Sequence, residues 1–162
     1  MRRIPYGVMN YEELIRECYF VDNTKYLHAL EQVKTAVFLR PKRFGKSVWC
    51  SVLAHYYDIN LKDRFQELFG ATDIGRNPTP LANSFLVLRF NFSTIEVGTL
   101  AQIERNFFAL VKRSVSSFAK QYESLADWSA VFKAENPAEM IDAVRVVVKD
   151  NGLPPIYVII DE

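Results

Sequence analysis

The stretch from Thr35 to Ser47, Thr-Ala-Val-Phe-Leu-Arg-Pro-Lys-Arg-Phe-Gly-Lys-Ser, constrains the fold more than any other part of the sequence. Ala36 to Leu39 is a short apolar run of the kind found in buried parallel strands, and a helical pattern begins directly after the loop. The order strand, loop, helix, with Gly45-Lys46-Ser47 at the junction, is typical of a phosphate-binding P-loop. We therefore expect an α/β fold built around this junction.

The residue types at the junction fit a bound triphosphate. Glycine lets the backbone approach the phosphates closely, so that successive N–H groups and the helix dipole face the negative charge. Lys46 would reach the β- and γ-phosphates, and the Ser47 hydroxyl would coordinate Mg²⁺. We predict that the whole loop and the first helical residues bind the nucleotide: Arg40, Pro41, Lys42, Arg43, Phe44, Gly45, Lys46, Ser47 and Val48.

One position departs from the usual P-loop pattern. The pattern G-x-x-x-x-G-K-[ST] has glycine at the place of Arg40. A Gly-Lys-Ser triplet alone has roughly a one-in-ten chance of arising in a chain of this length, so the alternative is a basic surface turn before an ordinary helix. We expect the Arg40 side chain to pack outward while Pro41 fixes the turn, and a phosphate contact by Arg40 is the other option.

The last residues supply a second motif. Ile156 to Ile160 is a continuous apolar run followed directly by Asp161 and Glu162, which is the form of a Walker B strand. Ligands in parallel sheets bind outside the carboxyl ends of the strands, so this acidic pair is expected beside the P-loop. Asp161 would hold Mg²⁺ through water, and Glu162 would orient and polarise the attacking water. Together the motifs predict a three-layer α/β/α P-loop NTPase with a mostly parallel sheet.

Hydrophobic periodicity and capping signals predict the remaining elements. We expect one domain over residues 1–162, in which residues 1–34 form a helical preamble that packs near the nucleotide base or shields the sheet edge. Asn91 and Ser93 fall at the carboxyl end of the second predicted strand, where they would face the ligand or cap the strand. The predicted elements are helices after Asn10, from Lys25 to about Lys34, from Val48 to Tyr57, from Asp63 to Phe69, from Thr99 to about Ser124 and from Pro137 to Asp150, and a strand from Phe85 to Phe92.

Composition excludes several other classes. Twenty basic and nineteen acidic residues nearly cancel, so no overall field favours nucleic acid or an anionic membrane. Cys18 and Cys50 provide neither a disulfide framework nor a metal motif and are expected to be buried thiols. His28 and His55 are isolated in the sequence, which argues against zinc or histidine chemistry. Because the sequence also lacks an apolar run of membrane-spanning length, it predicts a soluble, cytoplasmic protein.

With these motifs in view, the sequence resembles the AAA-ATPase-like proteins of bacteria and archaea over most of its length. The resemblance rests on Pro5-Tyr-Gly-Val8, on Tyr19-Phe-Val-Asp-Asn-Thr-Lys25 and above all on Phe38 to Ser47. In that family an arginine commonly stands at the place of Arg40, and the resemblance implies P-loop and Walker B roles for Lys46, Ser47, Asp161 and Glu162. Asn23 replaces a more usual lysine, and Trp49 and Cys50 replace smaller or aliphatic residues.

The leading hypothesis is an ATP-binding and ATP-hydrolysing module that changes the conformation of a partner domain. Glu162 and Lys46 would be the catalytic residues, with ATP and Mg²⁺ as ligands. A nucleotide-dependent switch without turnover and a P-loop kinase stay open as alternatives. Glu162 beside Asp161 favours hydrolysis, and no segment resembles a kinase lid.

The resemblance also implies partners outside this sequence. Many members carry a PD-(D/E)XK nuclease-like domain after the ATPase part, so we expect such a domain downstream, while homo-oligomers and nucleic-acid contacts stay open. We further expect the chain to be cut after the Walker B strand, because additional-strand P-loop proteins insert a later strand between Ala36–Leu39 and Ile156–Ile160. Without that strand, exposed apolar surface would favour self-association and slow turnover.

Overall fold

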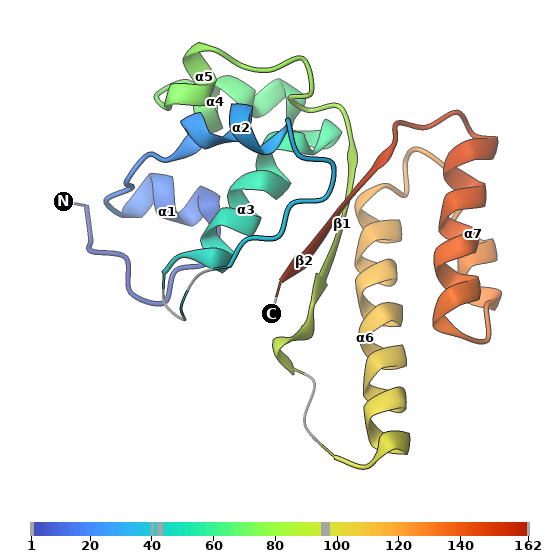
Figure 1. Ribbon diagram of the computed structural model, residues 1–162. Coiled ribbons are helices and arrows are strands. Elements are labelled where there is room, and N and C mark those ends of the chain that lie inside the picture. Colours follow the sequence, from blue (N-terminus) through green and yellow to red (C-terminus); the bar gives the residue numbers. More distant parts are fainter. Residues whose placement is uncertain (1, 40, 42–43, 95–97, 162) are drawn as a thin grey trace. The chain divides into compact units, whose positions relative to one another are not determined.

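The computed structural model describes residues 2–39, 41, 44–94 and 98–161. These residues form a mixed α/β structure in which helices predominate and two parallel strands pair (Figure 1). The α/β class is thereby confirmed, whereas the three-layer P-loop arrangement stays a prediction. The chain divides into two compact units, unit 1 from Met1 to Ser84 and unit 2 from Phe85 to Glu162.

Unit 1 is helical. Asn10 caps its first helix as predicted, because the side-chain oxygen accepts a hydrogen bond from the Glu13 N–H at 3.1 Å. The helix predicted from Asp63 to Phe69 is present as a 3₁₀ turn and a short α-helix that ends before Gly70. The elements are α1 (Tyr11–Glu17), α2 (Leu27–Leu30), α3 (Lys46–Tyr57), α4 (Phe65–Phe69) and α5 (Asp73–Arg76), with 3₁₀ turns at Thr24–Tyr26 and Ile59–Arg64.

An aromatic cluster forms the core of unit 1, where α1, α3 and α4 meet. Tyr11, Tyr56 and Phe69 are fully buried, and the Phe69 ring stacks on Tyr11 at 5.0 Å and meets Tyr56 edge to face at 5.4 Å. The Tyr11 hydroxyl donates to the Leu68 carbonyl at 2.8 Å, so its polar end is satisfied. The Tyr11 N–H donates to the Ser51 hydroxyl at 2.9 Å, which fixes the start of α1 against the middle of α3.

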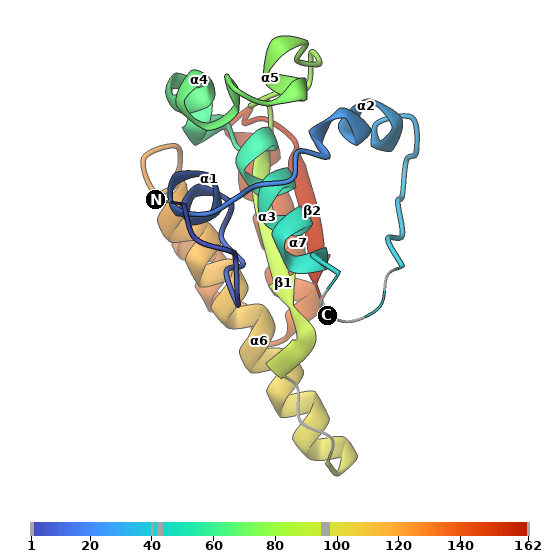
Figure 2. The same ribbon diagram turned by 90° about the vertical axis from the view of Figure 1, so that its left-hand side faces the viewer.

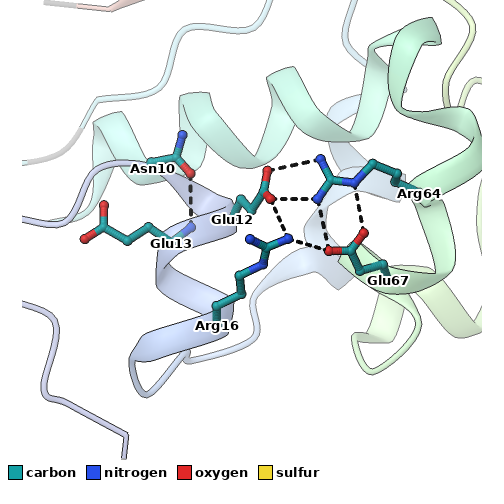
Figure 3. Close-up of polar contacts among 6 residues, drawn as sticks. All are labelled: Asn10, Glu12, Glu13, Arg16, Arg64 and Glu67. Atoms are coloured by element: carbon teal, nitrogen blue, oxygen red, sulfur yellow. Dashed lines mark hydrogen bonds and ion pairs between the residues drawn. The ribbon is translucent and has the colours of Figure 1, made fainter.

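Four charged side chains join α1 to α4 and the residue before it (Figure 3). Arg64 lies between two carboxylates, with Nη2 2.6 Å from Glu12 Oε1 and Nε 2.9 Å from Glu67 Oε2. Arg16 Nη2 contacts the same two carboxylates at 2.8 and 2.7 Å. Hydrogen bonds from Arg64, and then from Arg16, lower the pKa of Glu67 to about 2, and the Arg64 hydrogen bond holds the pKa of Glu12 below its ordinary value.

The predicted strand Ala36–Leu39 is wrong. These residues are not in a strand, and they are exposed, Val37 at 78%. A strand needs a hydrogen-bonded neighbour, and none of the residues from Ala36 to Leu39 is assigned to a strand or a β-bridge. The apolar run is therefore not part of a sheet.

The helix predicted from Lys25 to about Lys34 is shorter than expected. The 3₁₀ turn Thr24–Tyr26 leads into α2, which ends after four residues. Leu27 is fully buried, whereas Tyr26 and Val33 are 53% and 54% exposed. Helices in proteins are stabilised mainly by the packing of their apolar face. Here the apolar side chains of only one helical turn are packed against the rest of the unit.

Unit 2 contains β1 (Leu86–Asn91) and β2 (Ile156–Asp161), which pair in parallel from Leu86 opposite Ile156 to Asn91 opposite Asp161. Between them lie α6 (Leu100–Gln121) and α7 (Pro137–Asp150), with 3₁₀ turns at Phe92–Thr94 and Ser129–Lys133. Both helices lie on the same side of the strand pair (Figure 1, Figure 2). The two strands and two long helices predicted for this part of the chain are confirmed. Thr99 caps α6 and Pro137 begins α7, as predicted.

Three buried aromatic side chains at the end of α6 form part of the core of unit 2. The Phe118 ring meets Tyr122 and Trp128 edge to face, at 4.9 and 5.2 Å. The Tyr122 hydroxyl accepts a hydrogen bond from the Val87 N–H at 2.8 Å, and its carbonyl accepts one from the Trp128 indole at 2.9 Å. Tyr122 thus ties the end of α6 to the edge of β1.

Neither Cys18 nor Cys50 forms a disulfide, and the prediction of a buried thiol holds for Cys18, while Cys50 is half-buried. None of the described helices combines the length and the apolar character that crossing a membrane requires.

Tyr122→Phe removes the acceptor for the Val87 N–H, whose residue is only 5% exposed. We expect the free energy of unfolding to fall by about 1–3 kcal/mol, the cost of leaving a buried polar group unpaired. Urea denaturation measures this change in the free energy of unfolding. Tyr19→Phe is the matched control, because Tyr19 is 59% exposed and its change should stay within about 0.5 kcal/mol. Equal losses in both variants would contradict the assigned role of Tyr122.

The charge network predicts a loss of stability in acid. The folded-state pKa of Glu67 is lowered to about 2, from an ordinary value of 4.5, chiefly by its hydrogen bonds with Arg64. A depressed carboxylate pKa stabilises the fold above the unfolded pKa, and that contribution disappears as the pH falls from 4.5 toward 2. Urea midpoints measured across this range should fall. Arg64→Gln should flatten the dependence, whereas Arg145→Gln, whose partner Asp142 is exposed, should leave it unchanged.

Candidate functional site

The predicted phosphate loop is described in part. Arg40, Lys42 and Arg43 lie outside the described residues, so their predicted roles stay untested. Of the described loop residues, Pro41, Phe44 and Gly45 are exposed. The first residues of α3, Lys46, Ser47 and Val48, are half-buried.

Gly45 turns the loop into α3. Its φ of 77° and ψ of 20° lie in the left-handed region, which other residues adopt at a cost. As the N-cap, Gly45 accepts the first helical hydrogen bond, from the Trp49 N–H at 2.9 Å, and it offers no side chain to cap the helix. The N–H groups of Lys46, Ser47 and Val48 therefore lack intrahelical acceptors and are available to an external one.

The first two side chains of α3 are also available. Within the described residues, neither the Lys46 ammonium nor the Ser47 hydroxyl has a hydrogen-bond or ion-pair partner. The helix is 12 residues long, so its dipole adds positive potential at this end. Free N–H groups, a cation and a hydroxyl at one helix terminus can together bind a phosphate group.

Two contacts hold this helix end in place within unit 1. Ser51, one turn after Ser47, is 1% exposed and accepts the hydrogen bond from the Tyr11 N–H. On the other side of the loop, the Phe38 ring lies 6.4 Å from the Trp49 ring. Sequence reasoning did not single out Ser51. A serine at helical spacing from Ser47 was the available signal, but its partner in α1 depends on tertiary structure.

In unit 2, Asp161 is the last residue of β2. Its residue is 7% exposed, and among the described residues its carboxylate has no hydrogen-bond or ion-pair partner. None of the described side-chain oxygens is both buried and unpaired, so the oxygens of Asp161 keep contact with solvent although the residue as a whole is little exposed. They are therefore accessible to a cation or an ordered water. Glu162, the predicted catalytic residue, lies outside the described residues.

Asn91 lies opposite Asp161 in the parallel pair. Its Oδ1 accepts hydrogen bonds from the Ser93 N–H at 3.0 Å and from the Ser93 hydroxyl at 2.6 Å. The structure therefore places Asn91 and Ser93 at the carboxyl edge of the strands, as predicted, and shows that the amide oxygen caps the strand end.

The donor set fits Mg²⁺ better than a metal held by protein side chains alone. Among the described residues, no group of three or more His, Cys, Asp and Glu side chains has a metal-binding arrangement. Mg²⁺ commonly keeps several waters and takes one or two carboxylates together with phosphate oxygens. The Ser47 hydroxyl in unit 1 and the Asp161 carboxylate in unit 2 are each a hard oxygen donor of this kind. That they bind one ion together stays a prediction.

The helix terminus at Gly45, in an α/β protein, has the open N–H groups that phosphate-binding helices present. A family model for AAA-ATPase-like proteins, described as predicted AAA-ATPases, matches residues 5–162. The chain therefore belongs to the AAA-ATPase-like family, which indicates ATPase-like nucleotide binding. Searches of curated proteins and of solved structures returned no match. The resemblance seen in the sequence is thus confirmed, and the roles of individual residues stay predictions.

Gly45→Ala should destabilise the fold by about 1–2 kcal/mol, the cost of a left-handed L-residue, and weaken ATP binding. A Cβ at Gly45 meets no atom within 4 Å, so the cost arises from the backbone and not from a clash. Gly152→Ala is the matched control, because Gly152 has a φ of 58° and equally open surroundings. It should lose similar stability in urea and keep its affinity in an ATP titration. Unchanged ATP affinity in folded Gly45→Ala would contradict the prediction.

Proposed function

We propose that this chain binds and hydrolyses ATP with Mg²⁺ and thereby drives or switches a partner domain. The single observation that supports the proposal most is the open N-terminus of α3 at Gly45, with the unpaired Lys46 and Ser47 side chains next to it. It occurs in a chain of the AAA-ATPase-like family, at the place where the sequence has a P-loop motif.

Nucleotide binding rests on the loop. The N–H groups of the first helical turn donate hydrogen bonds to the phosphate oxygens, and Lys46 neutralises the charge of the β- and γ-phosphates as a compact cation. The basic residues Arg40, Lys42 and Arg43 add positive potential along the loop. Pro41, Phe44 and Val48 shape the backbone on either side of the phosphates.

Mg²⁺ supplies charge neutralisation and orientation of the transferred phosphoryl group when it is bound. In the proposal the Ser47 hydroxyl is a direct ligand, and Asp161 holds the ion through water. The low exposure of Asp161 and its lack of a protein partner in the described part of the chain support a role in binding a hard cation.

Hydrolysis requires a base beside the γ-phosphate. Glu162 orients the attacking water and takes one of its protons as the water oxygen bonds to the γ-phosphorus. The bond from that phosphorus to the bridging oxygen breaks, which releases inorganic phosphate and ADP. Lys46 stabilises the charge that develops on the phosphoryl oxygens.

A switch that binds ATP without turnover is the second candidate. One observation favours it: Ala36–Leu39, which precedes the loop, is not held in a strand. A loop whose preceding segment is not fixed in a sheet positions the nucleotide less rigidly, and hydrolysis depends on positioning more than binding does.

The proposed partner is a further domain or a second copy of the chain. The family resemblance favours a downstream PD-(D/E)XK nuclease-like domain, and a second copy of the chain is the other option. In either case ATP acts by changing the conformation that the partner contacts.

Lys46→Ala should weaken ATP binding by roughly 10-fold or more, since hydrogen bonds to charged groups contribute about 1.5–3 kcal/mol. Asp161→Asn should weaken it in the presence of Mg²⁺ and have little effect with EDTA. Calorimetric titration measures both. Lys34→Ala, which removes an exposed lysine outside the loop, is the control and should match the wild type. Equal affinity of Lys46→Ala and Lys34→Ala would refute the P-loop assignment.

A variant of Glu162 distinguishes ATP hydrolysis from a switch that binds ATP without turnover. Glu162→Gln should keep ATP affinity and abolish phosphate release. If the wild type binds ATP through Lys46 yet releases no more phosphate than Glu162→Gln, the switch function is the correct one.

A further inference from the structure

A row of basic side chains runs along one exposed face of α6. The 3.6-residue helical repeat places its members within a sector of about 100° around the helix axis. The opposite face is buried, with Val111, Val115 and Phe118 in the core of unit 2. The basic row consists of Arg105, Lys112, Arg113 and Lys120, all of them exposed.

The charges of the basic row are not compensated. Among the described residues, none of its members has a carboxylate partner. Other arginines of the chain do, since Arg64 pairs with Glu12 and Arg145 pairs with Asp142. Glu104 is the acidic residue of α6, and the helical repeat places it about 130° from the centre of the basic row.

Acidic side chains approach the basic row at one end. Glu123 and Asp127 line a shallow hollow together with Lys120, just beyond the last turn of α6. Asp127 is already occupied, because its carboxylate accepts hydrogen bonds from the Ser129 N–H and hydroxyl at 2.9 and 3.0 Å. The first three members of the row therefore form the more strongly positive part.

The basic row is long enough to contact several phosphates of a nucleic-acid duplex. From Arg105 to Lys120 it extends over 15 residues, or about 22 Å of helix axis. A duplex places one phosphate charge every 1.7 Å or so along its axis, so the row spans about six base pairs. Ala109 and Ser116 fall between the cations on the same face, and these short side chains leave the surface open to a phosphate backbone.

We propose that this face of α6 binds the phosphate backbone of double-stranded nucleic acid without reading its sequence. Surface helices that bind membranes bury their apolar face in the lipid, but the apolar face of α6 is occupied from Leu110 onward by its own unit. The available face offers cations with Ser116 between them, and arginine, lysine and serine side chains are common hydrogen-bond donors to phosphate oxygens. The inference concerns unit 2 alone and does not depend on ATP binding.

The test compares two variants of the whole chain that lose the same charge. One replaces Arg105, Lys112, Arg113 and Lys120 by glutamine, which keeps helix propensity high. The other replaces four exposed lysines elsewhere by glutamine: Lys25, Lys34, Lys62 and Lys149. Fluorescence anisotropy with a labelled DNA duplex of random sequence measures affinity at several salt concentrations, and circular dichroism confirms that both variants are folded.

Four phosphate contacts predict a slope of log K against log salt of about −3.6, which corresponds to a loss on the order of 100-fold between 50 and 200 mM salt. The wild type and the control variant should show this slope, and the α6 variant should lose at least roughly 10-fold in affinity at low salt with a much flatter slope. The inference is wrong if the wild type does not bind at low salt, if both variants weaken equally, or if the chain binds anionic lipid vesicles and not the duplex.

Discussion

Every backbone N–H and C=O group needs a hydrogen-bond partner, and this requirement decides where the chain is regular. β1 and β2 satisfy each other, and the Tyr122 hydroxyl supplies an acceptor for a strand N–H. Ala36–Leu39 has the composition of a strand but takes part in no β-pairing, and it stays irregular. At the start of α3 the first backbone N–H groups have no acceptor within the helix, so they need one from outside it. This is the part of the chain that the family resemblance assigns to phosphate binding.

Much of the fold can be predicted from the sequence because its signals are local. Thr99 and Gln102 form a reciprocal cap, and Pro137 fixes the first turn of α7, so both long helices begin where the pattern places them. The failures are Ala36–Leu39 and the helix predicted from Lys25. Both depend on a neighbour, a partner strand in one case and an apolar cover in the other, and single-sequence patterns do not contain that neighbour.

The candidate site shows the same division. Gly45, Lys46 and Ser47 can be selected from a motif, because the chemistry of phosphate binding demands those residue types in that order. The hydrogen bond that ties Ser51 to α1 and the unpaired state of the Asp161 carboxylate are tertiary properties. They required the structure, since each depends on which side chains approach from elsewhere in the chain.

The left-handed conformation of Gly45 also bears on the thermodynamics of ligand binding. The turn at Gly45 belongs to the start of α3, so the helix itself orients the N–H groups of its first turn. A preorganised terminus of this kind avoids most of the entropy loss that ordering a loop would add to binding. Affinity would then be set mainly by the exchange of phosphate hydration for these N–H groups, and it should vary with the size and charge of the anion more than with chain flexibility.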